Sequence, residues 1–271
     1  RVKDAGKAYR LAIDKGAKPH EGKVGPMELN IPAIEGIGGS VIYFVDRYGP
    51  GEVSIYDVDF VPTDAAKGFR HAGVGLSEID HVTHNVFRGN MSVWAGFYEK
   101  LFNFREVKYF DIEGKLTGLK SKAMTSPCGK IRIPINESSD DKSQIAEYLA
   151  EYKGEGIQHI ALSTGDIYAT VEKLRDMKVA FQSTIDTYFD GIDKRLPGHG
   201  EDVARLKRNQ ILIDGGPGAG LLLQIFTQNA IGPIFFESIQ RKGNEGFGEG
   251  NFQALFESIE LDQIRRGVLK P

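Results

Sequence analysis

The chain has 271 residues, of which 41% are hydrophobic and 10% aromatic, enough to bury the core of one large domain or two smaller ones. Its net charge of -3 provides no broad basic field, so we expect neither nucleic acid nor an acidic membrane surface as a partner. A single cysteine, Cys128, excludes an internal disulfide, and no apolar run approaches the ~20 residues that span a bilayer. No signal peptide is recognised, and we predict a cytoplasmic protein.

One pattern of strand, helix and further strands recurs along the chain. Apolar residues fall at helical spacing from Ala5 to Pro19, from Ser92 to Glu106 and from Ile167 to Phe181, and each stretch predicts an amphipathic helix. The second and third helices follow similar strands, LSEIDHVTHNV (Leu76 to Val86) and EGIQHIALST (Glu155 to Thr164). Each strand places a histidine after an isoleucine and one polar residue.

Runs rich in β-forming residues follow the helices. In residues 39–62 and 218–241 turn signals divide these runs, which predicts hairpins. One βαβββ unit cannot cover both faces of its sheet, so we expect units to pair and their strands to curve around a shared cavity. The first unit lacks its leading strand, because the chain opens on Arg1 within a helix. We therefore predict an α+β protein of repeated βαβββ units, with residues 1–75 as the remainder of an amino-terminal domain and residues 76–271 as a complete two-unit domain.

The pattern changes in residues 246–268, where apolar residues at helical spacing predict an amphipathic carboxy-terminal helix. These apolar residues are Phe252, Leu255, Phe256 and Ile259. A glycine-rich turn before a helix can cradle phosphate, but this one lacks a Gly-Lys-Ser ending and follows no dinucleotide-binding unit. We interpret its glycines as the hinge of a closing lid that excludes water. The glycines are Gly246, Gly248 and Gly250.

Three of the six histidines lie in turn-like or polar surroundings, where solvated side chains are expected. They are His20, His71 and His199. His81 and His84 share one strand but differ by three positions, so in a straight strand their side chains point to opposite faces. The repeat aligns His81 with His159, so we expect His84 either to support a metal ligand from behind or to have a structural role. Taken singly, His81 or His159 is more often a hydrogen-bonded core residue than a metal ligand.

Glu237 lies within the apolar run IGPIFFESIQR, where a buried unpaired carboxylate is costly unless a cation or hydrogen bonds compensate it. It follows His159 by 78 residues, the same spacing that separates His159 from His81. A salt bridge to Arg241 or Arg265 is the alternative explanation. Two imidazoles and one carboxylate would form a facial triad that leaves cis positions open on an octahedral metal, which suits Fe(II). Zinc, which prefers tetrahedral sites, is the second choice.

Eight stretches resemble the 4-hydroxyphenylpyruvate dioxygenase family of the vicinal-oxygen-chelate superfamily. They are IDHVTHNV, FYEKLFNF, RIPINE, EGIQHIAL, DTYF, LLLQIF, FFESIQRKG and GFGEGNFQALFESIE. RVKDAGKAYRLAIDKGA and GPMELNIPAIEGIGG resemble the end of the family's non-catalytic amino-terminal domain. The resemblance implies a glyoxalase-like fold of curved half-barrel sheets.

The resemblance also implies a homodimeric or homotetrameric enzyme that holds Fe(II) through His81, His159 and Glu237. Such enzymes bind 4-hydroxyphenylpyruvate through its own 2-oxoacid group, so they need no separate 2-oxoglutarate. With O2 they form homogentisate and CO2 by oxidative decarboxylation, ring hydroxylation and side-chain migration.

Pocket residues are assigned by the same resemblance. Polar side chains that would orient the phenol and the keto acid are Ser121, Asn136, Gln144, Gln158 and Gln224, with Asn136 and Gln224 as catalytic residues. Aromatic walls are Phe226, Phe235 and Phe252. From the residues alone, core packing explains the phenylalanines better, and surface or backbone-paired sites explain the polar residues equally well.

Two other functions stay open. Hydroxymandelate synthase shares the fold, triad and substrate but hydroxylates the benzylic carbon. The sequences PINE, KSQI, LLLQIF and GFGEGNF resemble the dioxygenase and favour it over the synthase. A non-catalytic ligand-binding module of the same fold would need no triad, so three candidate ligands favour an enzyme.

Overall fold

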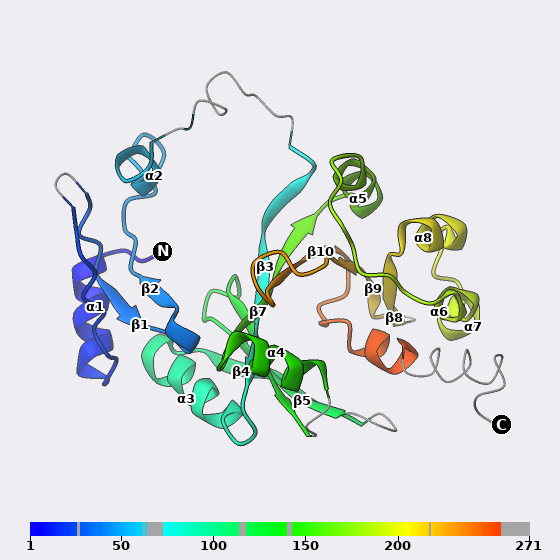
Figure 1. The fold of residues 1–271 in the computed structure, drawn as a ribbon, viewed down its shortest axis with the longest axis horizontal. Helices are drawn as coiled ribbons and strands as arrows, with labels where there is room; N and C mark the ends of the chain where they lie inside the picture. Colours follow the sequence, from blue (N-terminus) through cyan, green and yellow to red (C-terminus); the bar gives the residue numbers. More distant parts are fainter. Residues whose placement is uncertain are drawn as a thin grey trace.

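The structure is a computed structural model, and it describes residues 1–25, 28–61, 63, 73–113, 118–139, 143–216 and 218–255. In Figure 1 the amino-terminal segment, in blue, lies beside the first half of a long sheet, and the second half carries the yellow-green helices. Within the described residues, no helix is both long enough and apolar enough to cross a bilayer.

The amino-terminal elements form a small layer of their own. Helix α1 (Ala5–Asp14) begins after Asp4, whose side chain accepts a hydrogen bond from the first turn. Strands β1 (Ala33–Glu35) and β2 (Val41–Tyr43) pair antiparallel around the short helix η1 (Ile37–Gly39). Their apolar side chains join α1 in one core cluster that also contacts Phe97 and Phe102 of the helix α3 (Met91–Phe102).

The prediction of a hairpin in residues 39–62 is wrong. Among the described residues of that range, β2 is the one strand, and it pairs with β1, which precedes it in the chain. The next element is a short helix, α2 (Ile55–Val58), because Ser54 and Asp57 close a capping box at its start. The capping box satisfies the first backbone amides locally, so this segment needs no strand partner.

From Leu76 onward, eight strands form one sheet in the order β4-β5-β6-β3-β7-β10-β9-β8. The leading strands β3 and β7 pair antiparallel at its centre, and each is flanked by a parallel strand, β6 beside β3 and β10 beside β7. The sheet thus consists of two βαβββ units, which confirms the predicted fold class, and the predicted β9–β10 hairpin forms. The strands are β3 (Leu76–Val86), β4 (Arg105–Glu113), β5 (Gly118–Thr125), β6 (Arg132–Ser138), β7 (Gly156–Thr164), β8 (Leu212–Gly216), β9 (Gly220–Phe226) and β10 (Phe235–Lys242).

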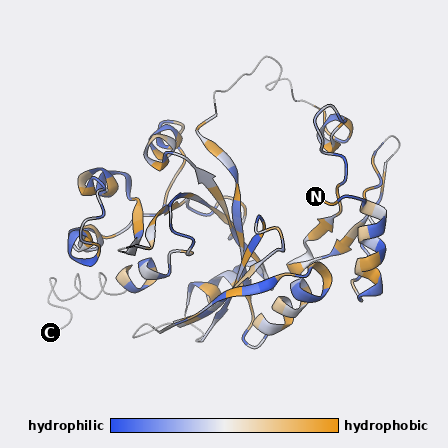
Figure 2. Cartoon of the chain, turned by 180° about the vertical axis from the view of Figure 1, so that it is seen from behind, coloured by the Kyte–Doolittle hydropathy of each residue, from blue (hydrophilic) through white to orange (hydrophobic). Residues whose placement is uncertain are grey.

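Helices cover the outer faces of both units. The predicted second and third helices form as α3 (Met91–Phe102) and α5 (Ile167–Asp176), and Figure 2 shows that both carry hydrophobic and hydrophilic residues. Besides α2, four helices of the described residues were not predicted from the sequence: α4 (Gln144–Tyr152), α6 (Asp186–Asp190), α7 (Ile192–Arg195) and α8 (Val203–Asn209). The apolar side chains of each unit pack between its strands and its helices, so each half of the sheet has its own core.

The carboxy-terminal segment begins the predicted helix. Residues 249–255 are helical, whereas Phe256 and Ile259 lie outside the described residues. Ala254 is buried in the core of the second unit, and Asn251 Oδ1 accepts a hydrogen bond of 2.6 Å from Tyr188 Oη. The start of the helix is therefore anchored to the second unit.

Candidate metal centre

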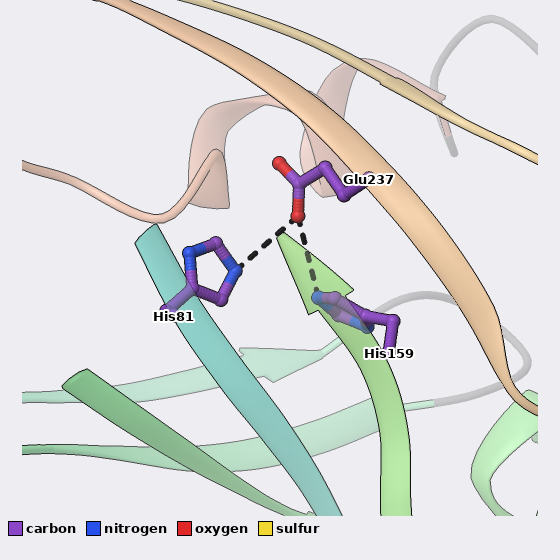
Figure 3. A group of neighbouring side chains, drawn as sticks. All are labelled: His81, His159 and Glu237. Atoms are coloured by element: carbon purple, nitrogen blue, oxygen red, sulfur yellow. Dashed lines mark ion pairs between the residues drawn. The ribbon is translucent and has the colours of Figure 1, made fainter. Parts of the chain in front are cut away.

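Three strands bring one side chain each to a single point. His81 lies on β3, His159 on β7 and Glu237 on β10, and Figure 3 shows both imidazoles directed at one oxygen of Glu237. His81 Nε2 lies 3.2 Å and His159 Nε2 3.3 Å from Glu237 Oε2. The three potential ligand atoms all lie within 4.8 Å of one another.

The strand register explains this convergence. Ala161 of β7 lies opposite both His81 and Glu237, so these side chains project from the same face of the sheet. His159 shares that face because it precedes Ala161 by two positions. The small Ala161 side chain leaves room for the longer ones to meet. The 78-residue spacing relates the leading strands β3 and β7, but it has no structural meaning for Glu237, because β10 is the last strand of its unit.

All three side chains are buried: His81 and Glu237 are 3% exposed and His159 is 9% exposed. Burial alone would raise the pKa of Glu237, but attraction to His81 and hydrogen bonds with both imidazoles outweigh it and lower the pKa to about 2. Burial lowers the pKa of His159 below its ordinary value. For His81 the effect of burial is outweighed by the Glu237 and Asp80 carboxylates, which raise its pKa.

Each imidazole is oriented through its other nitrogen. His81 Nδ1 lies 2.8 Å from Asp80 Oδ1, and His159 Nδ1 lies 3.0 Å from Gln158 Oε1. A carboxylate and an amide oxygen only accept hydrogen bonds, so both Nδ1 atoms donate. When the neutral imidazoles keep their protons on Nδ1, the Nε2 lone pairs are free for a metal ion, which then replaces the Nε2 hydrogen bonds to Glu237.

This donor set fits a divalent metal ion. The alternative salt bridge from Glu237 to Arg241 does not form, because Arg241 binds Asp80 at 2.8 Å, and Arg265 lies outside the described residues. A buried carboxylate that faces two imidazoles, with no lysine or arginine bound to it in the described part of the chain, is a donor set that could hold a metal cation.

Comparisons with known proteins agree with this geometry. Residues 1–61 match the family model "Hydroxyphenylpyruvate dioxygenase, HPPD, N-terminal", and residues 78–192 match the "Glyoxalase/Bleomycin resistance protein/Dioxygenase superfamily". Over 270 residues the chain is 64% identical to 4-hydroxyphenylpyruvate dioxygenase of Pseudomonas aeruginosa, covering 99% of this chain and 75% of the relative. The chain belongs to the 4-hydroxyphenylpyruvate dioxygenase family.

Two further similarities bear on the alternatives. The chain is 67% identical over 271 residues to Hemolysin VllY of Vibrio vulnificus, covering 99% of this chain and 75% of the relative. Among solved structures, a variant of 4-hydroxymandelate synthase from Streptomyces coelicolor has a TM-score of 0.74 at 25% identity, covering 97% of this chain and 75% of that one. Because identity to the dioxygenase is far higher than to the synthase, the predicted family and enzyme type are confirmed.

A cavity of about 370 Å³ lies beside the triad of this dioxygenase-family chain. Six of the predicted pocket residues line it: Asn136, Gln144, Gln158, Phe226, Phe235 and Phe252. A smaller cavity of about 50 Å³ is lined by Ser121 together with His81, His159 and Glu237. The structure therefore brings seven of the eight predicted substrate-binding residues to the two cavities.

Two of the predicted aromatic wall residues also pack against His159, one of the three candidate metal ligands. The Phe235 ring stacks on His159 with centroids 5.0 Å apart, and Phe226 contacts the same imidazole edge-on at 5.9 Å. These contacts restrict rotation of His159, as ligand preorganisation requires.

Gln224 is the predicted residue that lines neither cavity. Its side chain is buried, its Oε1 has no hydrogen-bond partner in the described part of the chain, and it lies directly against Gly248. Gly248 has a φ of +77°, and a Cβ there would collide with the Gln224 amide. A Cβ at Gly250 would likewise collide with Asp214, which accepts the Gly250 amide at 2.9 Å. These glycines thus permit close approach; the hinge role of Gly246, Gly248 and Gly250 stays a prediction.

Several residues at the site were missed by the sequence analysis. Asp80 orients His81, Phe247 contacts His81 edge-on at 5.4 Å, and Gln182 and Gln210 line the larger cavity. An acidic residue directly before a candidate histidine ligand was a usable signal for Asp80. Gln182 and Gln210 carried no sequence signal, because they lie in irregular or helix-terminal segments.

The other histidines differ in burial and in hydrogen bonding. His84 is buried, as its structural role predicts, and its Nε2 lies 2.6 Å from Tyr98 Oη. Burial lowers the pKa of His84 to about 4. The prediction that His199 is solvated is wrong: its side chain is 4% exposed, donates to Asp193 and accepts the Glu201 amide. His20 is partly exposed, and His71 lies outside the described residues.

Proposed function

We propose that this chain acts as an Fe(II)-dependent dioxygenase that converts 4-hydroxyphenylpyruvate and O2 to homogentisate and CO2. The observation that carries the proposal is the buried group of His81, His159 and Glu237 beside a cavity with aromatic walls. The dioxygenase relatives support the same activity.

The ligand set favours iron over zinc. Three protein ligands on one side of an octahedral ion leave cis positions for a bidentate 2-oxoacid and for O2, whereas tetrahedral zinc leaves one position. Bound Fe(II) would supply the redox chemistry that activates O2 at this site.

The chain's own residues prepare that site. Asp80 and Gln158 accept hydrogen bonds from the Nδ1–H groups of His81 and His159. These bonds direct both Nε2 atoms toward Glu237. Glu237 is ionised at neutral pH, because its pKa lies at about 2, and its charge helps to retain a divalent cation. Together these groups fix the ligand geometry before the metal arrives.

The larger cavity suits an aromatic 2-oxoacid. Phe226, Phe235 and Phe252 form an apolar wall for a phenol ring and exclude water, while Asn136 and Gln158 present amides to the polar groups of the substrate. Ser121 lines the small cavity beside the metal ligands, and Gln144 is an exposed residue of the larger one.

Gln224 contacts the substrate when the Gly248 segment withdraws from its amide. The unpartnered Gln224 Oε1 supports this role, because a buried amide oxygen without a hydrogen bond gains one from the hydroxyl of a bound phenol. The movement would make residues 246–255 a lid, with Gly246, Gly248 and Gly250 as its hinge.

Larger-scale features belong to the same proposal. Residues 1–75 belong to a non-catalytic domain and residues 76–271 to the catalytic domain, which is supported by the separate two-stranded sheet and by the family-model matches to 1–61 and 78–192. The working enzyme is a homodimer or homotetramer in the cytoplasm.

Anaerobic reconstitution with Fe(II), followed by 4-hydroxyphenylpyruvate and air, tests the proposal. Homogentisate identified by mass and chromatography supports it. Hydroxymandelate would keep the metal site and reassign the pocket to benzylic hydroxylation, a second candidate that the structural likeness to 4-hydroxymandelate synthase favours. Absence of iron binding and oxygen uptake would leave a non-catalytic binding module.

A further inference from the structure

Arg241 binds the carboxylate that supports the metal ligand His81. Arg241 Nε lies 2.8 Å from Asp80 Oδ2, and Arg241 Nη2 lies 2.8 Å from Asp80 Oδ1, the oxygen that also accepts His81 Nδ1. Arg132 Nη1 adds a longer contact of 3.4 Å to Asp80. The Asp80 side chain is 5% exposed and that of Arg241 13%, so water weakens this pair little.

The path of β3 explains how Asp80 and His81 serve one site. Neighbouring residues of a regular strand point to opposite faces, but the register of β3 with β7 shifts between Ile79 and His81, which makes Asp80 the extra residue. Such a bulge turns the Asp80 carboxylate toward the His81 ring. Arg241 reaches it from β10, where it shares a strand face with Glu237, four residues earlier.

The same guanidinium holds the chain that leads into the carboxy-terminal helix. Arg241 Nη1 donates to Asn244 O at 3.0 Å and to Gly246 O at 2.7 Å, so Arg241 contacts two carbonyls of this segment. The next residue, Phe247, has its ring centroid 5.7 Å from Arg241 Cζ and 5.4 Å from the His81 ring. One side chain therefore contacts both the support of a metal ligand and the segment that covers that ligand.

We propose that Arg241 is a positioning residue that couples the orientation of His81 to the seating of residues 244–247, the segment that leads into the helix at 249–255. This inference rests on the metal site of the proposed function. Metal binding and closure of this segment strengthen one another, because a single planar guanidinium must satisfy Asp80 and the Gly246 carbonyl together.

Arginine is required for this arrangement because its donors are divided between two directions. The Nε and Nη2 donors face the carboxylate side by side, while Nη1 points to the backbone carbonyls. The single ammonium of a lysine would keep the positive charge beside Asp80 but could not reproduce the side-by-side contact and the carbonyl contacts at once. The two functions can therefore be separated by substitution.

The test measures amide hydrogen exchange of residues 244–250 in the whole chain, without metal and with Fe(II) under anaerobic conditions. In the wild type, Fe(II) should slow exchange of these amides by at least ~10-fold, and Arg241→Met should abolish most of this slowing. Asp80→Asn should also reduce the slowing, although Asp80 has no hydrogen bond to these residues. Competition with a chelator should show that both variants bind Fe(II) about 10–100-fold more weakly.

Arg205→Met is the matched control. Arg205 binds Glu172 through Nε and Nη2, each at 3.0 Å, and neither residue lines the two cavities. This control should retain both the slowing and the Fe(II) affinity. Arg241→Lys should lose the slowing while its affinity for Fe(II) falls less than that of Arg241→Met, and it serves if the methionine variant does not fold.

Three results overturn the inference. A wild type that binds Fe(II) without slowing exchange at residues 244–250 would disprove the coupling alone. Full slowing in Arg241→Met or in Arg241→Lys would show that Arg241 does not transmit it. A wild type that takes up no Fe(II) would remove the metal site of the proposed function and the coupling with it.

Discussion

The two βαβββ units hold their metal-ligand histidines in different ways. In the first unit, His81 donates to Asp80, a buried carboxylate bound by Arg241. In the second unit, His159 donates to Gln158, an uncharged amide that also lines the larger cavity. The repeat therefore preserves the position of the ligand but not the group behind it. His81 is connected to the carboxy-terminal segment through the charged pair of Asp80 and Arg241, whereas His159 and its partner Gln158 both line the larger cavity.

The two leading strands β3 and β7 also differ in the side chain at one equivalent position. Three residues after its ligand, β3 carries His84, bonded to Tyr98, whereas β7 carries Leu162 at the corresponding position. A polar pair thus fills the first unit where the second has an aliphatic side chain. This difference concerns stability and its pH dependence rather than the metal.

Replacing Glu237, the candidate ligand that faces the histidines of both units, should have the largest effect. Glu237→Gln keeps the side-chain volume but removes the charge that faces both imidazoles, so we expect turnover to be lost and iron retention to fall sharply with the fold intact. Bound iron after gel filtration and oxygen uptake with 4-hydroxyphenylpyruvate measure this. Glu172→Gln, remote from both cavities, is the control. An active Glu237→Gln variant with normal iron content would contradict the ligand assignment.

Asp80→Asn should weaken Fe(II) binding about 10–100-fold, because it removes the charge that raises the basicity of His81. The loss of Fe(II) affinity should be larger than for a substitution of Gln158, the residue that supports His159. Chelator competition gives the dissociation constants of the two proteins, and Arg205→Met again provides a control. Equal affinity in the Asp80→Asn variant and the wild type would show that the two units support their ligands equally.

Making β3 resemble β7 should alter the pH dependence of stability. His84 has a folded pKa of about 4, below the ordinary value of 6.5, so between these pH values the unfolded chain binds a proton that the folded chain excludes. Stability is therefore lost as the pH falls, by about 2 kcal/mol between pH 7.5 and pH 5 from this residue alone.

The double variant His84→Leu, Tyr98→Phe removes both polar partners together, which avoids an unpaired buried hydroxyl. Its free energy of unfolding in urea should depend less on pH by about 2 kcal/mol over the same interval. Tyr98→Phe alone retains the titrating group and is the control. A double variant with the wild-type pH dependence would exclude His84 as its source.

Gln158→Ala should have the smallest effect. A neutral hydrogen bond contributes about 0.5–1.5 kcal/mol, so Fe(II) affinity should fall about 2–10-fold, less than for Asp80→Asn. Because Gln158 lines the cavity, the KM for 4-hydroxyphenylpyruvate should rise as well. A larger loss of iron than in Asp80→Asn would reverse the proposed order of support.

The sequence by itself was sufficient for the repeat, the fold class and the family. Helical and alternating apolar patterns are local, so they predicted α3, α5 and the β9–β10 hairpin, and the shared wording of IDHV and IQHI aligned His81 with His159. Glu237 was identified because a carboxylate within an apolar run requires a partner. These inferences need only the order of residues along the chain.

Other features depended on the tertiary structure, because they join residues far apart in the chain. Asp80 and Arg241 lie 161 positions apart and meet only through the strand order and the bulge in β3. The same reason applies to Gln224, which lies against Gly248 and lines neither cavity, and to His199, whose buried side chain donates to Asp193 and accepts the Glu201 amide. Local periodicity specifies which face of an element is apolar, whereas strand register and loop path decide which polar side chains meet.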